Sequence, residues 1–362
     1  MKKLIILTAA VAIGCCLFSC KKSKDGGDQK EVITDSLAYF TEQIKAHPND
    51  AQWYYKRANF QYNHQFIEEA FSDIQQSVKR DSTKAKYYVL FADIEYAMKD
   101  FDGSEEHLQK ALQLEPENNE VRLKLAELFY YRAKSIPSMY DEALKLLEEA
   151  RQKQPHNPKA YLIEAMCYKE KGDTAQFLHR IQMTIDQDPS EVKAHLELGK
   201  FYQNHLDPLC VDHYQNGLRI DPSNAEINYN LGLFYHDLGR GDEAKERFQY
   251  LVSVRHSGIY VANAYYELGY YALIEENDQE AASMFSHSIE CYQDILNQSP
   301  QITEAFPKFF EWFAMAYYAR GESYENRGLY EQARGDYNAA MQLVDNFEPA
   351  IQGLNAIDKK DK

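Results

Sequence analysis

The chain has 362 residues and carries 56 acidic against 40 basic side chains, which gives a formal net charge of −16. A protein that binds nucleic acid needs a basic surface to neutralise phosphates, and no extended basic run follows residue 30. The composition therefore argues against nucleic acid as a partner and favours partners that are basic or neutral.

The first 19 residues have the organisation of an export signal. Lys2 and Lys3 supply positive charge, and the apolar run over 4–13 is too short to span a membrane comfortably. The run closes with LFSC at 17–20, which resembles the sequence cleaved by bacterial lipoprotein signal peptidase. An ordinary cleaved signal peptide with an incidental cysteine is the alternative.

The lipoprotein resemblance implies that Cys20 becomes the mature N-terminus, with a thioether-linked diacylglycerol and an N-acyl chain such as palmitate. Several acyl chains anchor a protein stably where one binds marginally. Residues 21–30, KKSKDGGDQK, are polar and aperiodic, so 20–30 are predicted to be the lipidated cysteine and a flexible tether. Lys21 suggests sorting to the bacterial outer membrane by analogy with enterobacterial lipoproteins, and the orientation toward periplasm or cell surface stays open.

From residue 51 onward a pair of short amphipathic helices recurs. In the sixth pair Leu231, Gly232 and Tyr235 share one helical face, and Ala244 and Phe248 lie on the inner stripe of the second helix. Because the position of Ala244 is small in most pairs, we expect Gly232 to meet Ala244 where the helices cross. A small residue recurs at the position of Gly232, twice at a spacing of 34: Ala58, Ala92, Ala126, Ala165, Gly199, Gly269 and Gly321.

This pattern resembles the tetratricopeptide repeat, a helix-turn-helix unit of about 34 residues. One such hairpin cannot bury its apolar face alone, so the repeats stack on one another. The resemblance implies an all-α, right-handed α-solenoid of about eight repeats over residues 51–346. Proline ends several of the repeats, where the second helix has to stop: Pro116, Pro155, Pro189 and Pro222.

The regular spacing is interrupted and capped at predictable places. The second helix of repeat seven is expected to be lengthened, through Leu296. A helix over 31–46 matches the second half of a repeat, so 31–50 are predicted to form an N-terminal capping half-repeat. Residues 347–362 are predicted to form a C-terminal capping helix and a charged tail. Insertions are expected near 132–139, 257–261 and 300–313.

One cluster of side chains could coordinate a metal, in the turn of the fifth repeat: His205, Asp207, Cys210, Asp212 and His213. Its spacing matches no established zinc pattern, and Cys210 holds a packing position. Hydrolase and phosphate-binding motifs do not occur in a suitable context. We therefore predict no metal, no cofactor and no enzymatic activity.

Three cysteines remain besides the export signal and Cys20: Cys167, Cys210 and Cys291. Their placement suits core packing, and their odd number argues against a complete disulfide framework. The aromatic run over 306–313, FPKFFEWF, has two interpretations. It either packs on the lengthened second helix of repeat seven, which we favour, or forms an exposed docking patch.

A set of tyrosines lies away from the packing positions. Tyr62, Tyr96 and Tyr130 are spaced by 34 and 34, and Tyr55, Asn59 and Tyr62 share one helical face. In tetratricopeptide proteins this face lines the concave groove that binds extended peptides or helices. The resemblance implies a partner-binding groove formed by Tyr55, Asn59, Tyr62, Asp93, Tyr96, Glu127, Tyr130 and Tyr131.

The two carboxylates of this set favour a partner segment that carries Lys or Arg, and plain surface tyrosines are the alternative interpretation. Tyr229, Tyr266 and Tyr318 occupy another groove position in the C-terminal half. Some members of the family grip a C-terminal carboxylate with a Lys/Asn/Arg clamp. The matching positions carry Tyr55, Asn59, Leu90, Glu120 and Lys124. Only Asn59 and Lys124 fit, so this clamp is not supported.

These features together predict a membrane-anchored scaffold or adaptor that binds a protein partner in the bacterial cell envelope. A glycan-handling outer-membrane lipoprotein is one alternative, although such proteins carry large insertions and those of this chain are short. A structural homo-oligomer is another. The partner and the oligomeric state stay open.

Overall fold

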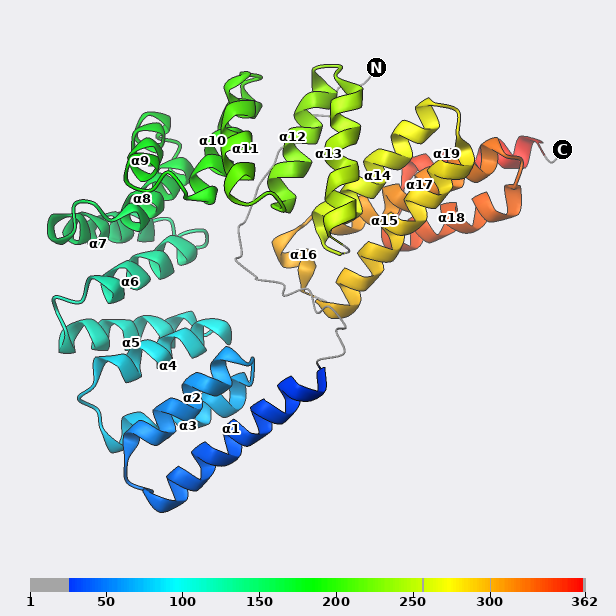
Figure 1. The fold of residues 1–362 in the computed structure, drawn as a ribbon. Helices are drawn as coiled ribbons and strands as arrows, with labels where there is room; N and C mark the ends of the chain where they lie inside the picture. Colours follow the sequence, from blue (N-terminus) through cyan, green and yellow to red (C-terminus); the bar gives the residue numbers. More distant parts are fainter. Residues whose placement is uncertain (1–25, 256, 300, 361–362) are drawn as a thin grey trace. The chain divides into compact units, whose positions relative to one another are not determined.

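The computed structural model describes residues 26–255, 257–299 and 301–360 (Figure 1). The predicted export signal and Cys20 lie outside these residues. Every regular element in them is a helix, which makes the fold an all-α solenoid as predicted. The described chain divides into two compact units, here called the N-terminal unit, up to Ala194, and the C-terminal unit, from His195.

Each repeat consists of a first and a second helix that pack as an antiparallel hairpin. The N-terminal unit holds the single helix α1 (Gly26–Ala46) and the hairpins α2 (Ala51–Asn63) with α3 (Ile67–Arg80), α4 (Ala85–Ala97) with α5 (Phe101–Leu114), α6 (Asn119–Arg132) with α7 (Met139–Lys153), and α8 (Pro158–Glu170) with α9 (Thr174–Gln187).

The C-terminal unit takes up α10 (Val192–Asn204), which begins just before the boundary and pairs with α11 (Leu209–Ile220). It continues with α12 (Ala225–Asp237) and α13 (Gly241–Val254), α14 (Ile259–Ile274) and α15 (Asp278–Gln298), the single turn α16 (Ile302–Ala305), α17 (Phe309–Asn326) and α18 (Tyr330–Leu343), and the last helix α19 (Glu348–Lys360).

The predicted irregularities are placed as follows. Helix α1 begins at Gly26, so residues 26–30, predicted to belong to the tether, are helical. The connection between α6 and α7 covers 133–138, and α15 runs to Gln298, beyond Leu296. The insertion predicted at 300–313 is shorter, because the first helix of the last repeat already begins at Phe309, within the aromatic run.

Local sequence fixes the ends of these helices. An Asp or Asn side chain accepts a hydrogen bond from a first-turn amide at seven helices, through Asp50, Asp100, Asn118, Asn157, Asp173, Asn224 and Asn277. Seven hairpin turns contain one residue in the left-handed region: Gln65, Lys99, Gly172, Leu206, Gly239, Glu276 and Gly328. The turn therefore keeps its geometry even where it lacks glycine.

The crossing of the two helices is filled differently from the prediction. A Cβ atom added at Gly232 would lie 2.5 Å from the ring of Phe248, so Phe248 rather than Ala244 supplies the nearest atoms. Ala244 is buried beside this crossing, but an aromatic ring needs the space that a missing Cβ leaves. The same holds for Gly269 with Phe285 and for Gly321 with Tyr337, at 2.6 Å in both cases.

The N-terminal unit fills the equivalent crossing with alanine and an aliphatic side chain. Ala58 and Ile74 are both completely buried in one core cluster, and Ala92 and Leu108 share another. At the equivalent positions of the next two hairpins, Ala126 and Leu147, and then Ala165 and Ile181, are all buried. The change to glycine with an aromatic ring begins at Gly199 with Tyr214.

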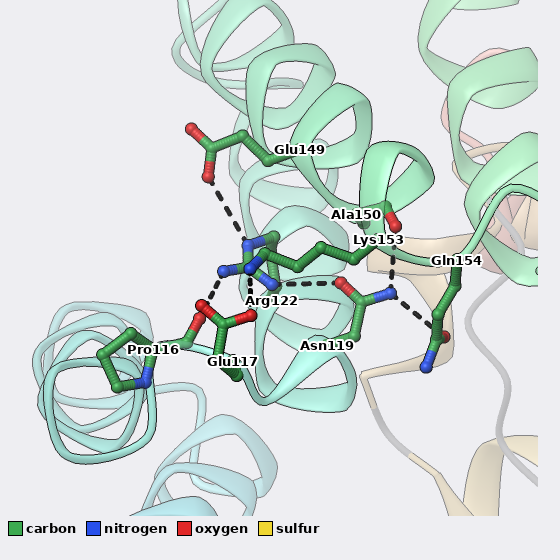
Figure 2. Close-up of polar contacts among 8 residues, drawn as sticks. All are labelled: Pro116, Glu117, Asn119, Arg122, Glu149, Ala150, Lys153 and Gln154. Carbon is green, nitrogen blue, oxygen red and sulfur yellow. Dashed lines mark hydrogen bonds and ion pairs between the residues drawn. The ribbon is translucent and has the colours of Figure 1, made fainter.

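A buried arginine ties neighbouring helices together at the end of the third hairpin (Figure 2). Arg122 is 5% exposed, and its guanidinium donates to Asn119 Oδ1 at 3.0 Å and to the carbonyl of Pro116 at 2.6 Å. Asn119 in turn donates to the carbonyl of Ala150 at 3.1 Å. The start of α6 is thereby fixed to the end of α7, and the buried charge is hydrogen-bonded.

The cysteines and the aromatic run serve packing. Cys167, Cys210 and Cys291 are buried free thiols, and burial raises the pKa of Cys167 to about 12. Phe309 and Phe313 are fully buried, with ring centroids 5.4 and 5.3 Å from that of Tyr292 on α15. The packing interpretation of the run is therefore confirmed for these two residues, whereas Phe310 is 37% exposed.

Candidate partner-binding surface

The predicted groove residues of the N-terminal unit all lie on first helices. We call them the tyrosine strip: Tyr55, Asn59 and Tyr62 on α2, Asp93 and Tyr96 on α4, and Glu127, Tyr130 and Tyr131 on α6. Successive first helices contact one another in this unit, as α2 does α4 and α6 does α8. The stacking of the repeats therefore brings the strip onto one side of the unit.

One part of the strip is formed between α2 and α4. The rings of Tyr55 and Tyr87 lie 5.0 Å apart, and Lys86 Nζ is 5.2 Å from the centre of the Tyr55 ring. Burial, and then the carboxylate of Asp93, raise the pKa of both Tyr55 and Tyr62. Asp93 thus faces both tyrosines across the repeat boundary.

A second part lies between α4 and α6. The ring of Tyr96 packs edge-on against Tyr131 at 5.7 Å and against Phe101 at 5.5 Å, and Tyr96 stays 36% exposed. Tyr130 packs against Tyr140 at 6.2 Å, and Lys134 lies 5.2 Å from the Tyr131 ring. The strip therefore presents aromatic edges with a cation beside them.

The strip is also partly structural. Tyr55 and Tyr62 pack against one buried core cluster and Tyr130 against the next, so they are only partly exposed. Asn59 and Tyr96 are the more open positions of the strip on α2 and α4. Loss of Tyr62 or Tyr130 is therefore expected to remove packing as well as contact area.

The carboxylates of the strip have cations of their own chain. Lys124 Nζ lies 2.7 Å from Asp93 Oδ1, and Lys159 Nζ lies 2.8 Å from Glu127 Oε2. Sequence analysis missed both pairs, although a lysine 31 or 32 residues after each acid was the available signal. The strip therefore offers a partner less negative charge than its sequence suggests.

The side chains of the fifth-repeat turn have separate structural roles. Cys210 is fully buried, His213 stacks on Tyr202 at 5.4 Å, and Asp207 accepts from the amide of Leu209 at 3.0 Å. No group of three or more potential metal ligands occurs among the described residues. At the clamp positions, Leu90 is buried and Lys124 is held by Asp93.

Two shallow cavities lie elsewhere, over the second helices. One is lined by residues of α5, α6 and α7, among them Glu105, Phe129 and Met139, and the other by residues of α11, α12 and α13. Neither involves the tyrosine strip. Within the described ranges, no helix combines the length and the apolar character needed to cross a bilayer.

Comparison with known proteins gives matches to repeats of one kind. Family models described as "Tetratricopeptide repeat" match residues 85–118 and 138–202, and one described as "TPR repeat" matches residues 211–239. These matches bear out the resemblance drawn from the small and large positions.

Curated relatives and solved structures are similar over parts of the chain. Superkiller complex protein 3 of Homo sapiens is 24% identical over 235 residues, covering 60% of this chain and 15% of that protein. Type IV pilus assembly protein PilF of Pseudomonas aeruginosa is 30% identical over 89 residues, covering 24% and 35%. The crystal structure of PilW, a type IV pilus biogenesis factor, is 16% identical with a TM-score of 0.48, covering 56% of this chain and 97% of that one.

The alignments thus span only 15% and 35% of the length of the two curated relatives. Repeats of this kind build extended surfaces that bind other proteins. The paired helices and the family matches together show that the chain is an all-α solenoid containing tetratricopeptide repeats.

Proposed function

We propose that the chain is a lipid-anchored adaptor of the bacterial cell envelope that binds a segment of a partner protein on its tyrosine strip. The observation that supports this role most is the recurrence of partly exposed tyrosines on successive first helices. Tyrosine supplies a large apolar area with few rotatable bonds and a polar tip, which suits a surface that stays soluble when empty.

The ion pairs of the strip bear on the charge of the partner segment that we propose. Since Asp93 and Glu127 are paired with Lys124 and Lys159, the alternating charges of the strip suit a segment of mixed polarity. The aromatic rings then supply most of the affinity, as they do at many interface hot spots.

The test of partner binding is crosslinked capture from native membranes, followed by an affinity measurement with the captured protein. Changing Tyr96, the more exposed ring, to alanine is expected to cost about 2 kcal/mol, roughly a thirtyfold loss of affinity. Tyr39→Ala is the matched control, because Tyr39 is 50% exposed on α1 outside the strip. Equal affinity of the Tyr96→Ala variant and the wild type would remove the strip from the binding surface.

Anchoring at the outer membrane is a separate part of the proposal, and it rests on the LFSC sequence at 17–20. Cys20→Ser is expected to leave an uncleaved precursor and to abolish labelling by a palmitate analogue. Cys167→Ser is the control, since a buried thiol should not take part. Labelling that survives in the Cys20→Ser variant would contradict the anchor.

A further inference from the structure

The first helices of the C-terminal unit carry tyrosine at one fixed place in three repeats. Tyr229, Tyr266 and Tyr318 each precede a crossing glycine by three residues. Their rings lie 5.8, 5.5 and 5.7 Å from those of Phe248, Phe285 and Tyr337, the aromatic residues that fill the crossings. The exchange of alanine for glycine thus lets a second-helix ring support a first-helix tyrosine.

Two carboxylates lie among these tyrosines. The hydroxyl of Tyr318 donates to Glu322 Oε1 at 2.7 Å, and that of Tyr229 donates to Glu267 Oε1 over a longer 3.5 Å. Burial, and then the charges of Glu267 and Glu322, raise the pKa of Tyr266. This tyrosine therefore lies within electrostatic reach of both acids. We call these five residues the tyrosine–glutamate cluster: Tyr229, Tyr266, Glu267, Tyr318 and Glu322.

Neither carboxylate forms an ion pair within the described part of the chain. Helix α14 contains no Lys, Arg or His, and the one arginine of α17, Arg320, is held by Asp336 at 2.7 Å. On α12, His236 Nδ1 instead contacts the hydroxyl of Tyr271 at 2.8 Å. The cluster therefore differs from the tyrosine strip, where each carboxylate is paired with a lysine.

Burial makes these acids hold a proton more tightly. Burial raises the pKa of Glu267 to about 7, with Asp237 adding to the effect and the Tyr229 hydroxyl opposing it. Burial also raises the pKa of Glu322, with Glu325 adding and the Tyr318 hydroxyl opposing. Both side chains nevertheless keep part of their surface accessible to solvent. A cation could therefore reach them and would stabilise their charged form.

We propose that the tyrosine–glutamate cluster binds a protonated arginine or lysine side chain of a partner segment. Carboxylates in a partly desolvated site attract a cation more strongly than in water, and tyrosine faces add cation–π attraction. A metal ion fits less well, because no group of three potential metal ligands occurs in the described residues. The occupant is a protein segment only if the proposed adaptor function holds, so the inference rests on that proposal.

The test uses a fluorescein-labelled Gly/Ser peptide with a pair of arginines, and the same peptide with neutral citrulline in their place. Binding to the purified full-length chain is followed by fluorescence anisotropy. Combined Glu267→Gln and Glu322→Gln substitution is expected to weaken arginine-peptide binding by about tenfold or more. Citrulline-peptide binding is expected to be weak and unchanged.

The matched control is Asp294→Asn with Glu331→Gln, which removes the same charge from exposed positions on the second helices α15 and α18. An equal loss in this control would show diffuse attraction to an acidic protein, and unchanged binding in the cluster variant would exclude the cluster. Either result overturns the inference. Glu322→Gln alone, with a thermal midpoint beside each titration, provides a milder variant if the double one unfolds.

The two proposals fail separately. If Tyr96→Ala abolishes capture of the native partner while the arginine peptide binds the cluster variant as tightly as the wild type, only the cluster is rejected. If the arginine peptide binds the cluster variant more weakly than the wild type but Tyr96→Ala captures the native partner as well as the wild type, only the role of the strip is rejected.

Discussion

The two units fill the crossing between the helices of each hairpin with different pairs of side chains. In the N-terminal unit the helix crossing holds alanine against Ile74, Leu108, Leu147 or Ile181, all buried. In the C-terminal unit it holds glycine against an aromatic ring of Tyr214, Phe248, Phe285 or Tyr337. Since protein interiors are close-packed, a larger side chain on one helix requires a smaller one on the other.

This exchange has a consequence for the surface. Aromatic rings at the crossing extend toward the first helices and support Tyr229, Tyr266 and Tyr318. In the N-terminal unit the equivalent first-helix positions are Tyr55, Val89, Leu123 and Leu162, and beside Gly199 in the C-terminal unit the position holds Leu196. An aromatic crossing thus supports a first-helix tyrosine in three repeats, whereas Tyr55 beside Ala58 packs on Tyr87 instead.

The largest expected effect comes from emptying an aromatic crossing. Phe248→Ala should lower the free energy of unfolding by about 3–5 kcal/mol, because neither the introduced methyl group nor Gly232 would fill the space. Leu108→Ala should cost less, since Ala92 still occupies part of its crossing. Hydrogen exchange resolved by repeat is the measurement, with loosening expected in α12–α14 for the first variant and in α4–α6 for the second. Equal costs would mean that the two kinds of crossing do not differ.

Adding a methyl group tests the complementarity directly. Gly232→Ala should cost about 1–3 kcal/mol, because its Cβ would overlap the Phe248 ring. The further change Phe248→Leu should recover part of this loss by recreating the N-terminal kind of crossing. A double-mutant cycle by chemical denaturation measures the coupling. Strictly additive costs would contradict the pairing.

Glu267 should make the stability of the C-terminal unit depend on pH. The folded pKa of Glu267, about 7, exceeds the ordinary value of 4.5, so the native state binds the extra proton between these values. Stability should therefore fall as pH rises from about 4.5 to 7, by roughly 1–2 kcal/mol after allowance for partial exposure. Glu267→Gln should flatten this dependence in urea titrations across the pH range. Persistence of the same slope would assign it to other groups.

The smallest effects concern the strip. Tyr96→Ala should change the free energy of unfolding by about 0.5 kcal/mol or less, because the ring is among the exposed ones. Tyr62→Ala should cost more, since Tyr62 packs on the core of its repeat. Thermal midpoints of the two variants, compared with that of the wild type, measure the two stability costs. A larger shift for Tyr96 would reverse the division between surface and packing residues.

The sequence by itself determined the repeat architecture. Helix period, the prolines that end repeats and the recurring small positions are local or strictly periodic, so they can be read without knowing which helices meet. The sequence also indicated the lengthened second helix of repeat seven, which ends at Gln298, and favoured packing of the 306–313 run on it, as Phe309 and Phe313 do.

Only the tertiary structure decided which side chains meet across helices and repeats. It placed Phe248 rather than Ala244 against Gly232, and it paired Asp93 with Lys124 and Glu127 with Lys159. It also left Glu267 and Glu322 without a cation among the described residues while surrounding them with tyrosines. Such contacts depend on side-chain direction and on the offset between stacked hairpins, and a one-dimensional period specifies neither.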